Sequence, residues 1–348
     1  MTKFQNLGTF DGGIIKSSAT APAVAAGGRF QVMDQAAVAA GGAFLLSELE
    51  KRDTLVREPL TSVTYARDLP IRVGGGWAEY VSAMNVSYGV TGGSEDGVVH
   101  AAGATGIPMV QADFGKELYR THIFSCGLRV LWVDMQRGNM TGRSYDGLLK
   151  DGVRLTYDKH LDCNGYVGIK LYGTYGVINN PDVSATNAAD NGSGSTHWRD
   201  KSPDQILTDV NDVILMTWER AGNDRSAIPN HIIMPYEQYN YIATTRVSEL
   251  AEKTILQFLL DNNVAKTNGA DLFIGGVTWC KGAGIGGTDR MVVYRNEERF
   301  IAMDELAPLN RAMTSADTSN VCYDTAYMAN LSEVQMFYEE TITYIDGI

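Results

Sequence analysis

The stretch GGGWAEYVSAMNVSYGVTGGSEDGVVHAAGATG, residues 74–106, holds nine glycines in 33 positions. Its segment AEYVSAMNVSY, residues 78–88, alternates in a way that is typical of a strand with one apolar face. That face carries Tyr80, Met84, Val86 and Tyr88. After the acidic, glycine-rich tip GGSEDG (92–97), the chain returns through VVHAAGATGIPMV (98–110). We predict a long two-stranded excursion, which needs a partner surface because so thin a hairpin is only marginally stable alone.

The segment SSATAPAVAAGGRFQVMDQAAVAAGGA, residues 17–43, consists mostly of small side chains, with alanine and glycine at 14 of its 27 positions. The hexapeptide AVAAGG occurs in it twice, at 23–28 and 37–42. Such a segment buries too little apolar area to offset its own ordering entropy. We expect an arm held either by its own domain or by a neighbouring subunit. A short amphipathic helix is predicted after it, at 44–52.

Composition and charge limit the possible functions. The 348 residues are 44% hydrophobic and 20% charged, which is typical of about two globular units. The net charge of -12 leaves no wide basic footprint for nucleic-acid phosphates. The sequence has neither an 18-residue apolar run for a membrane span nor an N-terminal signal segment. Four scattered cysteines without a CxxC pair indicate buried thiols in a reducing compartment: Cys126, Cys163, Cys280 and Cys322.

Two long helices are predicted. The first, at 144–164, has a stripe expected to be buried: Tyr145, Leu148, Leu149, Gly152, Leu155 and Thr156. Gly165 stands where a left-handed C-cap is expected. Gly147 and Gly152 lower its helix propensity, which indicates close approach to another backbone.

The second long helix begins at Ser202, the predicted N-cap. Pro203 takes the first helical position, Gln205 completes a capping box, and Gly222 ends the helix. Its predicted buried stripe is Ile206, Leu207, Val210, Val213 and Ile214.

Strands are expected on either side of these helices, at 63–73, 124–133, 231–234, 271–276, 277–280 and 290–294. The glycine-rich GAGIGG (282–287) is predicted to be a hairpin loop between two of them. Shorter helices are expected near 236–242 and 249–260, and the alternating C-terminal segment 333–348 is expected to join a sheet. Because helices and strands are mixed without a regular βαβ order, the predicted fold class is α+β.

No motif predicts a catalytic, cofactor-binding or metal site. GAGIGG satisfies G-x-G-x-x-G, but a strand signal follows it, whereas a dinucleotide site needs a helix N-terminus there. The pairs His122–Cys126 and His160–Cys163 have the spacing for zinc ligands, although unrelated buried residues are the simpler interpretation. The oxygen-rich loop at 182–195 lacks the closing Glu of a calcium-binding EF-hand. A structural, assembling protein is therefore the leading class.

Four motifs in the second half resemble one family: Trp198 with SPDQILTDV (202–210), PNHIIMP (229–235), GTDRMVVY (287–294) and YIDGI (344–348). Together with the order of arm, excursion and long helix, they resemble the major capsid proteins of tailed bacteriophages, which share the Hong Kong 97-like fold with encapsulins. The chain departs from that pattern at NLSEV (330–334), where relatives begin a strand with two glycines and a valine.

The resemblance implies an α+β fold with an N-terminal arm, an extended hairpin called the E-loop, a peripheral domain with a long spine helix, and an axial domain. The order here places the arm and short helix at 1–53, the E-loop at 68–112, the spine helix at 144–164 and the axial domain at 203–312. The peripheral domain then takes 54–67, 113–202 and 313–348.

The resemblance also implies a mechanical function without catalysis. Many copies form pentamers and hexamers of an icosahedral shell that encloses double-stranded DNA, in a virion assembled in the bacterial host cytoplasm. The implied partners are further copies, a portal, scaffolding proteins and decoration proteins, with no membrane. An acidic subunit suits a container that does not grip phosphates. Because numbering begins at Met1, no maturation cleavage is expected. Some relatives also crosslink covalently through lysine, but residues 74–106 contain no lysine, so crosslinking is not expected here.

Two other classes remain open at this stage. An encapsulin-like nanocompartment shares the fold but holds an enzyme cargo, and a soluble enzyme with an unrecognised site needs no shell. Electron microscopy of the purified particle separates the three.

We predict that deleting residues 1–43 leaves a folded subunit that builds no stable shell. The segment carries few large side chains, so intramolecular burial changes little, whereas 43 extended residues reach about 140 Å along a neighbour. Circular dichroism should be nearly native while light scattering detects only monomers or capsomers. Full-sized shells from the truncated chain would show that the arm does not interlock subunits, and loss of folding would assign it to its own domain.

Overall fold

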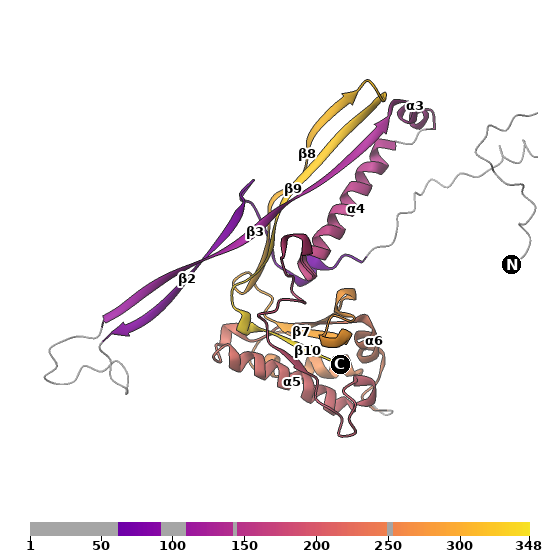
Figure 1. Ribbon diagram of the computed structural model, residues 1–348. Helices are drawn as coiled ribbons and strands as arrows, with labels where there is room; N and C mark the ends of the chain where they lie inside the picture. Colours follow the sequence, from indigo (N-terminus) through magenta and orange to yellow (C-terminus); the bar gives the residue numbers. More distant parts are fainter. Residues whose placement is uncertain (1–61, 92–108, 142–144, 249–252) are drawn as a thin grey trace, which may run out of the picture. The chain divides into compact units, whose positions relative to one another are not determined.

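The computed structural model describes residues 62–91, 109–141, 145–248 and 253–348 (Figure 1). The described residues all belong to one compact unit, Thr61–Ile348. The arm, the helix predicted at 44–52 and the hairpin tip at 92–97 therefore lie outside the described residues. Within the described part, no helix is both long and apolar enough to cross a membrane.

The described chain forms two five-stranded sheets with helices, which confirms the α+β class. The first sheet contains, in spatial order, β1 (Ile71–Val73), β8 (Ile301–Asp317), β9 (Cys322–Met336), β3 (Met109–Leu131) and β2 (Tyr80–Thr91). β1 runs parallel to β8, and all other neighbours are antiparallel.

The long strand β3 has two successive partners. Its residues 109–120 pair with β2, and its residues 121–131 pair with β9. β2 and the first half of β3 thus form a two-stranded ribbon, roughly 40 Å long at 3.4 Å per residue, which extends away from β8 and β9 (Figure 1). The strand predicted at 124–133 is the second half of β3, but it ends at Leu131, and Trp132 begins α3 (Trp132–Thr141).

Helix α4 (Tyr145–Tyr166) lies where a helix was predicted at 144–164, but its buried face overlaps the predicted stripe only in part, at Leu149, which is half-buried and packs beside Val153. That face carries Val153, Tyr157, Leu161 and Asn164. In the predicted stripe, Leu148 is exposed, and Gly152 faces open space, since no atom lies within 4 Å of the point that a Cβ on it would occupy. The polar atoms explain the difference: the Tyr157 hydroxyl donates to Glu305 at 2.5 Å and Asn164 donates to the Ser332 carbonyl at 2.9 Å.

The end of α4 also differs from the prediction. Gly165 lies inside the helix, and a Cβ on it would come within 2.8 Å of Leu69 Cδ1, so its smallness serves packing. The left-handed residue is Gly168, with φ 74°, whose amide donates to the Cys163 carbonyl. The segment predicted as extended at 63–73 contains a helical turn, α2 (Tyr65–Asp68), before β1.

The second sheet contains, in spatial order, β4 (Ala185–Asn187), β10 (Ile342–Asp346), β7 (Arg290–Tyr294), β5 (His231–Met234) and β6 (Phe273–Gly276). Its helices are α5 (Pro203–Arg220), α6 (Tyr236–Thr244), α7 (Ile255–Asp261) and α8 (Val264–Thr267). Short 3-10 turns are η1 (Lys170–Tyr172), η2 (Trp198–Asp200), η3 (Arg225–Ala227), η4 (Thr278–Cys280), η5 (Ile285–Gly287) and η6 (Glu339–Thr341).

The start of α5 confirms the capping prediction. The Ser202 hydroxyl accepts the Gln205 amide, and the Gln205 side chain accepts the Ser202 amide at 2.9 Å. Pro203 is the first helical residue, and Gly222 follows the helix with φ 70°. The predicted stripe is buried at Ile206, Val210, Val213 and Ile214, while Leu207 is half-buried.

The middle strands of the second sheet are buried on both faces. Ile232, Val293 and Ile345 belong to the core that includes the α5 stripe. Their sequence neighbours Ile233, Val292 and Tyr344 belong to the core that includes residues of α4 and β9. A strand covered on both sides has no polar face, which is why these segments are continuous apolar runs.

Three further predictions for this half need correction. In the strand predicted at 277–280, residues 278–280 form the turn η4 instead. GAGIGG is not a hairpin loop, because β5 lies between β6 and β7 in the sheet. The helix predicted to begin at 249 is described from Ile255, with Thr254 as its N-cap and Gln257 completing a capping box that the prediction missed.

A buried ion pair joins two of the sequence motifs. Arg290 of β7 holds Asp346 of β10 through two bonds, Nε to Oδ1 at 2.7 Å and Nη2 to Oδ2 at 2.9 Å. Arg290 also donates to the Ile178 carbonyl, and Asp346 accepts the amide of Ile285 in the GAGIGG turn. Burial alone would raise the pKa of Asp346, but the hydrogen bonds from Arg290 and Ile285 outweigh it and hold the pKa below its ordinary value.

We predict that Arg290→Met destabilises the fold by about 3–5 kcal/mol, because it leaves the Asp346 carboxylate buried without its partner. The matched control is Lys253→Met, which removes an exposed pair with Asp261 and should change stability by less than about 1 kcal/mol. Urea unfolding measures both. Equal effects of the two substitutions would contradict the importance of the buried pair.

Candidate functional site

The structure brings together two of the four residues considered as zinc ligands. His122 on β3 and His160 on α4 approach with their Nε2 atoms 3.1 Å apart. Cys126 and Cys163 do not complete the set: among the described residues, no cluster of three metal-ligating side chains includes them. Both cysteines are half-buried, while Cys280 and Cys322 are buried, so the expectation of buried thiols is right for two of the four.

The histidine pair is an uncharged link between β3 and α4. Burial, with a smaller contribution from His160, lowers the pKa of His122 to about 4, and burial also lowers the pKa of His160. The ring of His122 stacks on Tyr172, and Phe124 lies against His160 with ring centroids 5.0 Å apart. At neutral pH one imidazole donates to the other, which holds the helix against the strand where the ribbon begins.

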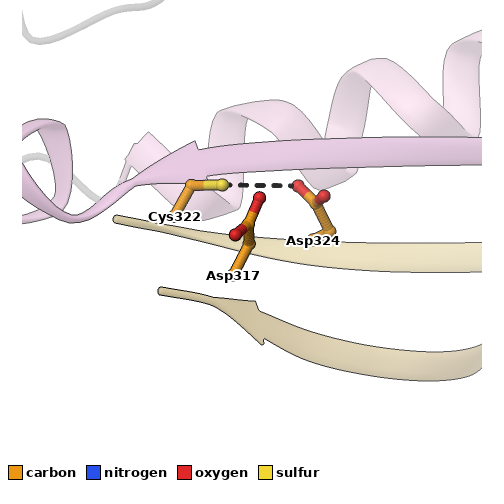
Figure 2. A group of neighbouring side chains, drawn as sticks. All are labelled: Asp317, Cys322 and Asp324. Carbon is orange, nitrogen blue, oxygen red and sulfur yellow. Dashed lines mark hydrogen bonds between the residues drawn. The ribbon is translucent and has the colours of Figure 1, made fainter. Parts of the chain in front are cut away.

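Asp317, Cys322 and Asp324 form a compact group at the turn between β8 and β9 (Figure 2). Its atoms already have partners. Arg129 binds both oxygens of Asp324 at 2.7 Å, and the Cys322 thiol donates to Asp324. Asp317 accepts amide bonds from the turn that follows it. A metal would have to displace these bonds, so we interpret the three side chains as part of the hydrogen-bonded structure of the turn.

The ribbon has one apolar face and one polar face. Directly opposed residues share a face, so the register groups the even-numbered residues of both strands. The apolar face carries Tyr80, Met84, Val86, Tyr88, Val90, Val110, Phe114 and Leu118, and all are exposed. Met84 is 77% exposed and Phe114 71%. A contiguous apolar surface of this kind marks an interaction site.

Sequence reasoning found half of this face. The β2 residues were predicted from their alternation, and the register confirms that they share a face. The β3 residues were missed because the return strand was placed at 98–110. The signal was present, since residues 109–120 also alternate, with Val110, Phe114 and Leu118 at even positions.

An acidic groove lies at the base of the ribbon. It has a volume of about 470 Å³, and its apolar floor includes Val334, Met336 and Phe337. Five carboxylates line it: Glu117, Asp182, Glu333, Glu339 and Glu340. Burial, followed by the charges of Asp182, Glu340 and Glu117, raises the pKa of Glu339. Like charges therefore gather here, and no cation among the described residues pairs with Asp182, Glu339 or Glu340.

The described chain resembles known structures over most of its length. A family model described as "Major capsid protein" matches residues 97–348. The capsid of Myoviridae phage XM1 matches with a TM-score of 0.71 at 16% identity, covering 87% of this chain and 98% of that one. The capsid of a native GTA particle matches with a TM-score of 0.61 at 11% identity, covering 90% and 99%. A chain of Microbacterium phage Oxtober96 matches with a TM-score of 0.59 at 11% identity, covering 87% and 98%. No curated protein matches the sequence.

The histidine pair predicts an acid-sensitive fold. The folded pKa of His122, about 4, lies below its ordinary value of 6.5, so between these values the unfolded chain binds a proton that the folded chain does not. Stability contributed by the neutral pair is therefore present above pH 6.5 and is lost as the pH falls, by about 2 kcal/mol at pH 4.5.

The test replaces the pair by His122→Gln with His160→Gln, two amides that keep one hydrogen bond and do not titrate. Thermal melting between pH 7 and pH 4.5 should fall less steeply for the double variant than for the natural chain. His197→Gln serves as the control and should leave the slope unchanged. Identical slopes for the double variant and the natural chain would rule out the pair as the acid-sensitive element.

Proposed function

The chain belongs to the major capsid protein family, a family of phage coat proteins with the Hong Kong 97-like fold, and from this premise we propose that its ribbon joins copies into a closed shell. Pentamers and hexamers form the shell, which encloses double-stranded DNA. The single observation that carries the proposal is the apolar face of β2 and β3, exposed along the whole described ribbon. A surface of this kind is stable in water only where another molecule covers it.

The partner that suits the ribbon is a second copy. A ribbon of one copy on a different surface of the next makes a heterologous contact, which propagates from copy to copy until a ring or shell closes. Each contact covers large side chains such as Met84, Tyr88 and Phe114, and apolar burial contributes about 25 cal/mol per Å². Repetition at every copy makes the assembly far more stable than one contact.

The proposed domains follow the two sheets. The second sheet with α5 to α8 is the axial domain, and the first sheet with α4 as spine helix is the peripheral domain. β8 runs from Ile301 across residue 312 within the first sheet, and β10 pairs with β7 in the second sheet. On this division the axial domain ends before β8 and also includes β4 and β10. Residues 1–53 remain the proposed arm.

The remaining partners follow from the same role. A shell filled with DNA requires a portal for entry, scaffolding for correct closure, and in some shells decoration proteins, and we propose assembly in the host cytoplasm. The net charge of -12 suits a container that releases its DNA. An encapsulin-like compartment is not favoured, because the family model that matches is that of major capsid proteins. A coat protein acts mechanically, so we assign no catalytic role.

Electron microscopy of particles purified from infected or expressing cells tests the function. We expect closed icosahedral particles, filled with DNA when the packaging proteins are present. Particles filled with protein cargo in place of DNA, or a chain that remains monomeric under all conditions, would contradict the proposal.

A substitution on the ribbon tests its part in assembly. Phe114→Asp places a charge in the centre of the apolar face and should abolish shells, because that charge would be buried without a partner. Circular dichroism and melting should stay nearly unchanged, since Phe114 is exposed in the single chain. The control is Gln111→Asp, which places the same charge on the opposite, polar face of β3. If both variants assemble alike in light scattering, the apolar face is not an interface.

A further inference from the structure

The apolar face of the ribbon carries only positive charge. Lys116 and Arg120 lie on it, opposite Met84 and Tyr80, and the face has no acidic residue between 80 and 90 or between 110 and 120. Arg120 donates to the Tyr172 carbonyl at 3.2 Å. Lys116 makes no ion pair within the described part of the chain. In a chain with a net charge of -12, an apolar surface with basic residues alone indicates an acidic counterpart.

The groove at the ribbon base has the complementary character. Glu117 is occupied by Asn85 and the Tyr119 hydroxyl, and Glu333 by the Arg120 amide. The carboxylates of three others make no hydrogen bond or ion pair with any described residue: Asp182, Glu339 and Glu340. They lie beside an apolar floor that includes Met336 and Phe337. The groove is thus mainly polar, with uncompensated negative charge beside a smaller apolar surface.

The two surfaces do not satisfy each other within one chain. Of the three ribbon residues that line the groove, Glu117 and Tyr119 lie on the polar face and only Leu118 belongs to the apolar face. Lys116 points from the opposite face, because successive residues of a strand alternate between the two sides. Contact between the basic, apolar face and the acidic groove therefore requires a second copy.

We propose that the apolar face of one ribbon docks on the acidic groove of a second copy, with Lys116 paired to Glu339 and Glu340. This inference rests on the proposed function and names the surface that receives the ribbon. The apolar side chains of the face cover the floor of the groove, and the lysine neutralises carboxylates that pair with no cation among the described residues of their own chain. Charge complementarity selects the groove over the rest of the acidic surface and fixes the register of the contact.

Exchange of charges tests the pairing. Lys116→Glu and Glu340→Lys should each raise the protein concentration needed for shell formation at least tenfold, since each places like charges together. The double variant Lys116→Glu with Glu340→Lys restores opposite charges and should assemble near the natural concentration. Light scattering and electron microscopy provide the readouts, and circular dichroism confirms folding of each variant, whose changed residues are exposed.

Two controls separate this pairing from other effects. Lys116→Glu with Asp204→Lys restores the net charge at an exposed site away from the groove and should not restore assembly. Lys159→Glu, on the exposed side of α4, should assemble normally. Rescue by Asp204→Lys as efficient as that by Glu340→Lys would overturn the specific pairing.

The outcomes also distinguish this inference from the proposed function. If the natural chain forms shells and Lys116→Glu forms them equally well, the groove is not the docking surface, although the coat function stands. Normal shells of Lys116→Glu that contain no DNA would assign the basic face to DNA and would likewise overturn the inference. If the natural chain forms no shells with its packaging proteins present, the function itself fails.

Discussion

The buried carboxylate of Asp68 is the contact on which the arrangement of the two sheets depends. It is 0% exposed and accepts hydrogen bonds from Arg67, from His231 of β5 and from the Tyr166 hydroxyl at the end of α4. Its backbone carbonyl accepts the Tyr294 hydroxyl of β7 at 2.6 Å. Burial would raise the pKa of Asp68, but these donors lower it, so the charge is retained. Asp68, at the end of α2 and shortly before β1, thus binds the first sheet and α4 to the second sheet.

The elements that could be predicted from sequence are those whose signal is local. The helix cap at Ser202 and the strand at 231–234 are each predicted by a pattern of a few neighbouring residues, and the structure confirms both. The face of α4 is different, because Tyr157 and Asn164 are buried only through partners far along the chain, Glu305 and Ser332. The leucine stripe was the strongest local signal for the buried face, but hydrogen bonds to residues far along the chain determine which side of the helix is buried.

The candidate site divides in the same way. The apolar face of β2 was readable from alternation in 78–88, whereas its continuation on β3 depends on pairing register, which no single strand reveals. The acidic groove was beyond sequence reasoning, since Glu117, Asp182 and Glu339 come from three distant segments. Two of the four residues considered as zinc ligands do meet, His122 and His160, but among the described residues no cluster of three metal-ligating side chains includes Cys126 or Cys163.

The continuity of β3 connects the body of the protein to its assembly. The strand passes without a break from its pairing with β2 to its pairing with β9, so the backbone ladder of the first sheet sets the direction of the ribbon. α4 holds the strand near that transition through His122 and Phe124. If the ribbon covers a neighbour as proposed, packing inside one copy therefore determines the angle between the two bodies. In a heterologous contact that angle decides between a closed shell and an open filament, so the interior of the subunit contributes to the curvature of the assembly.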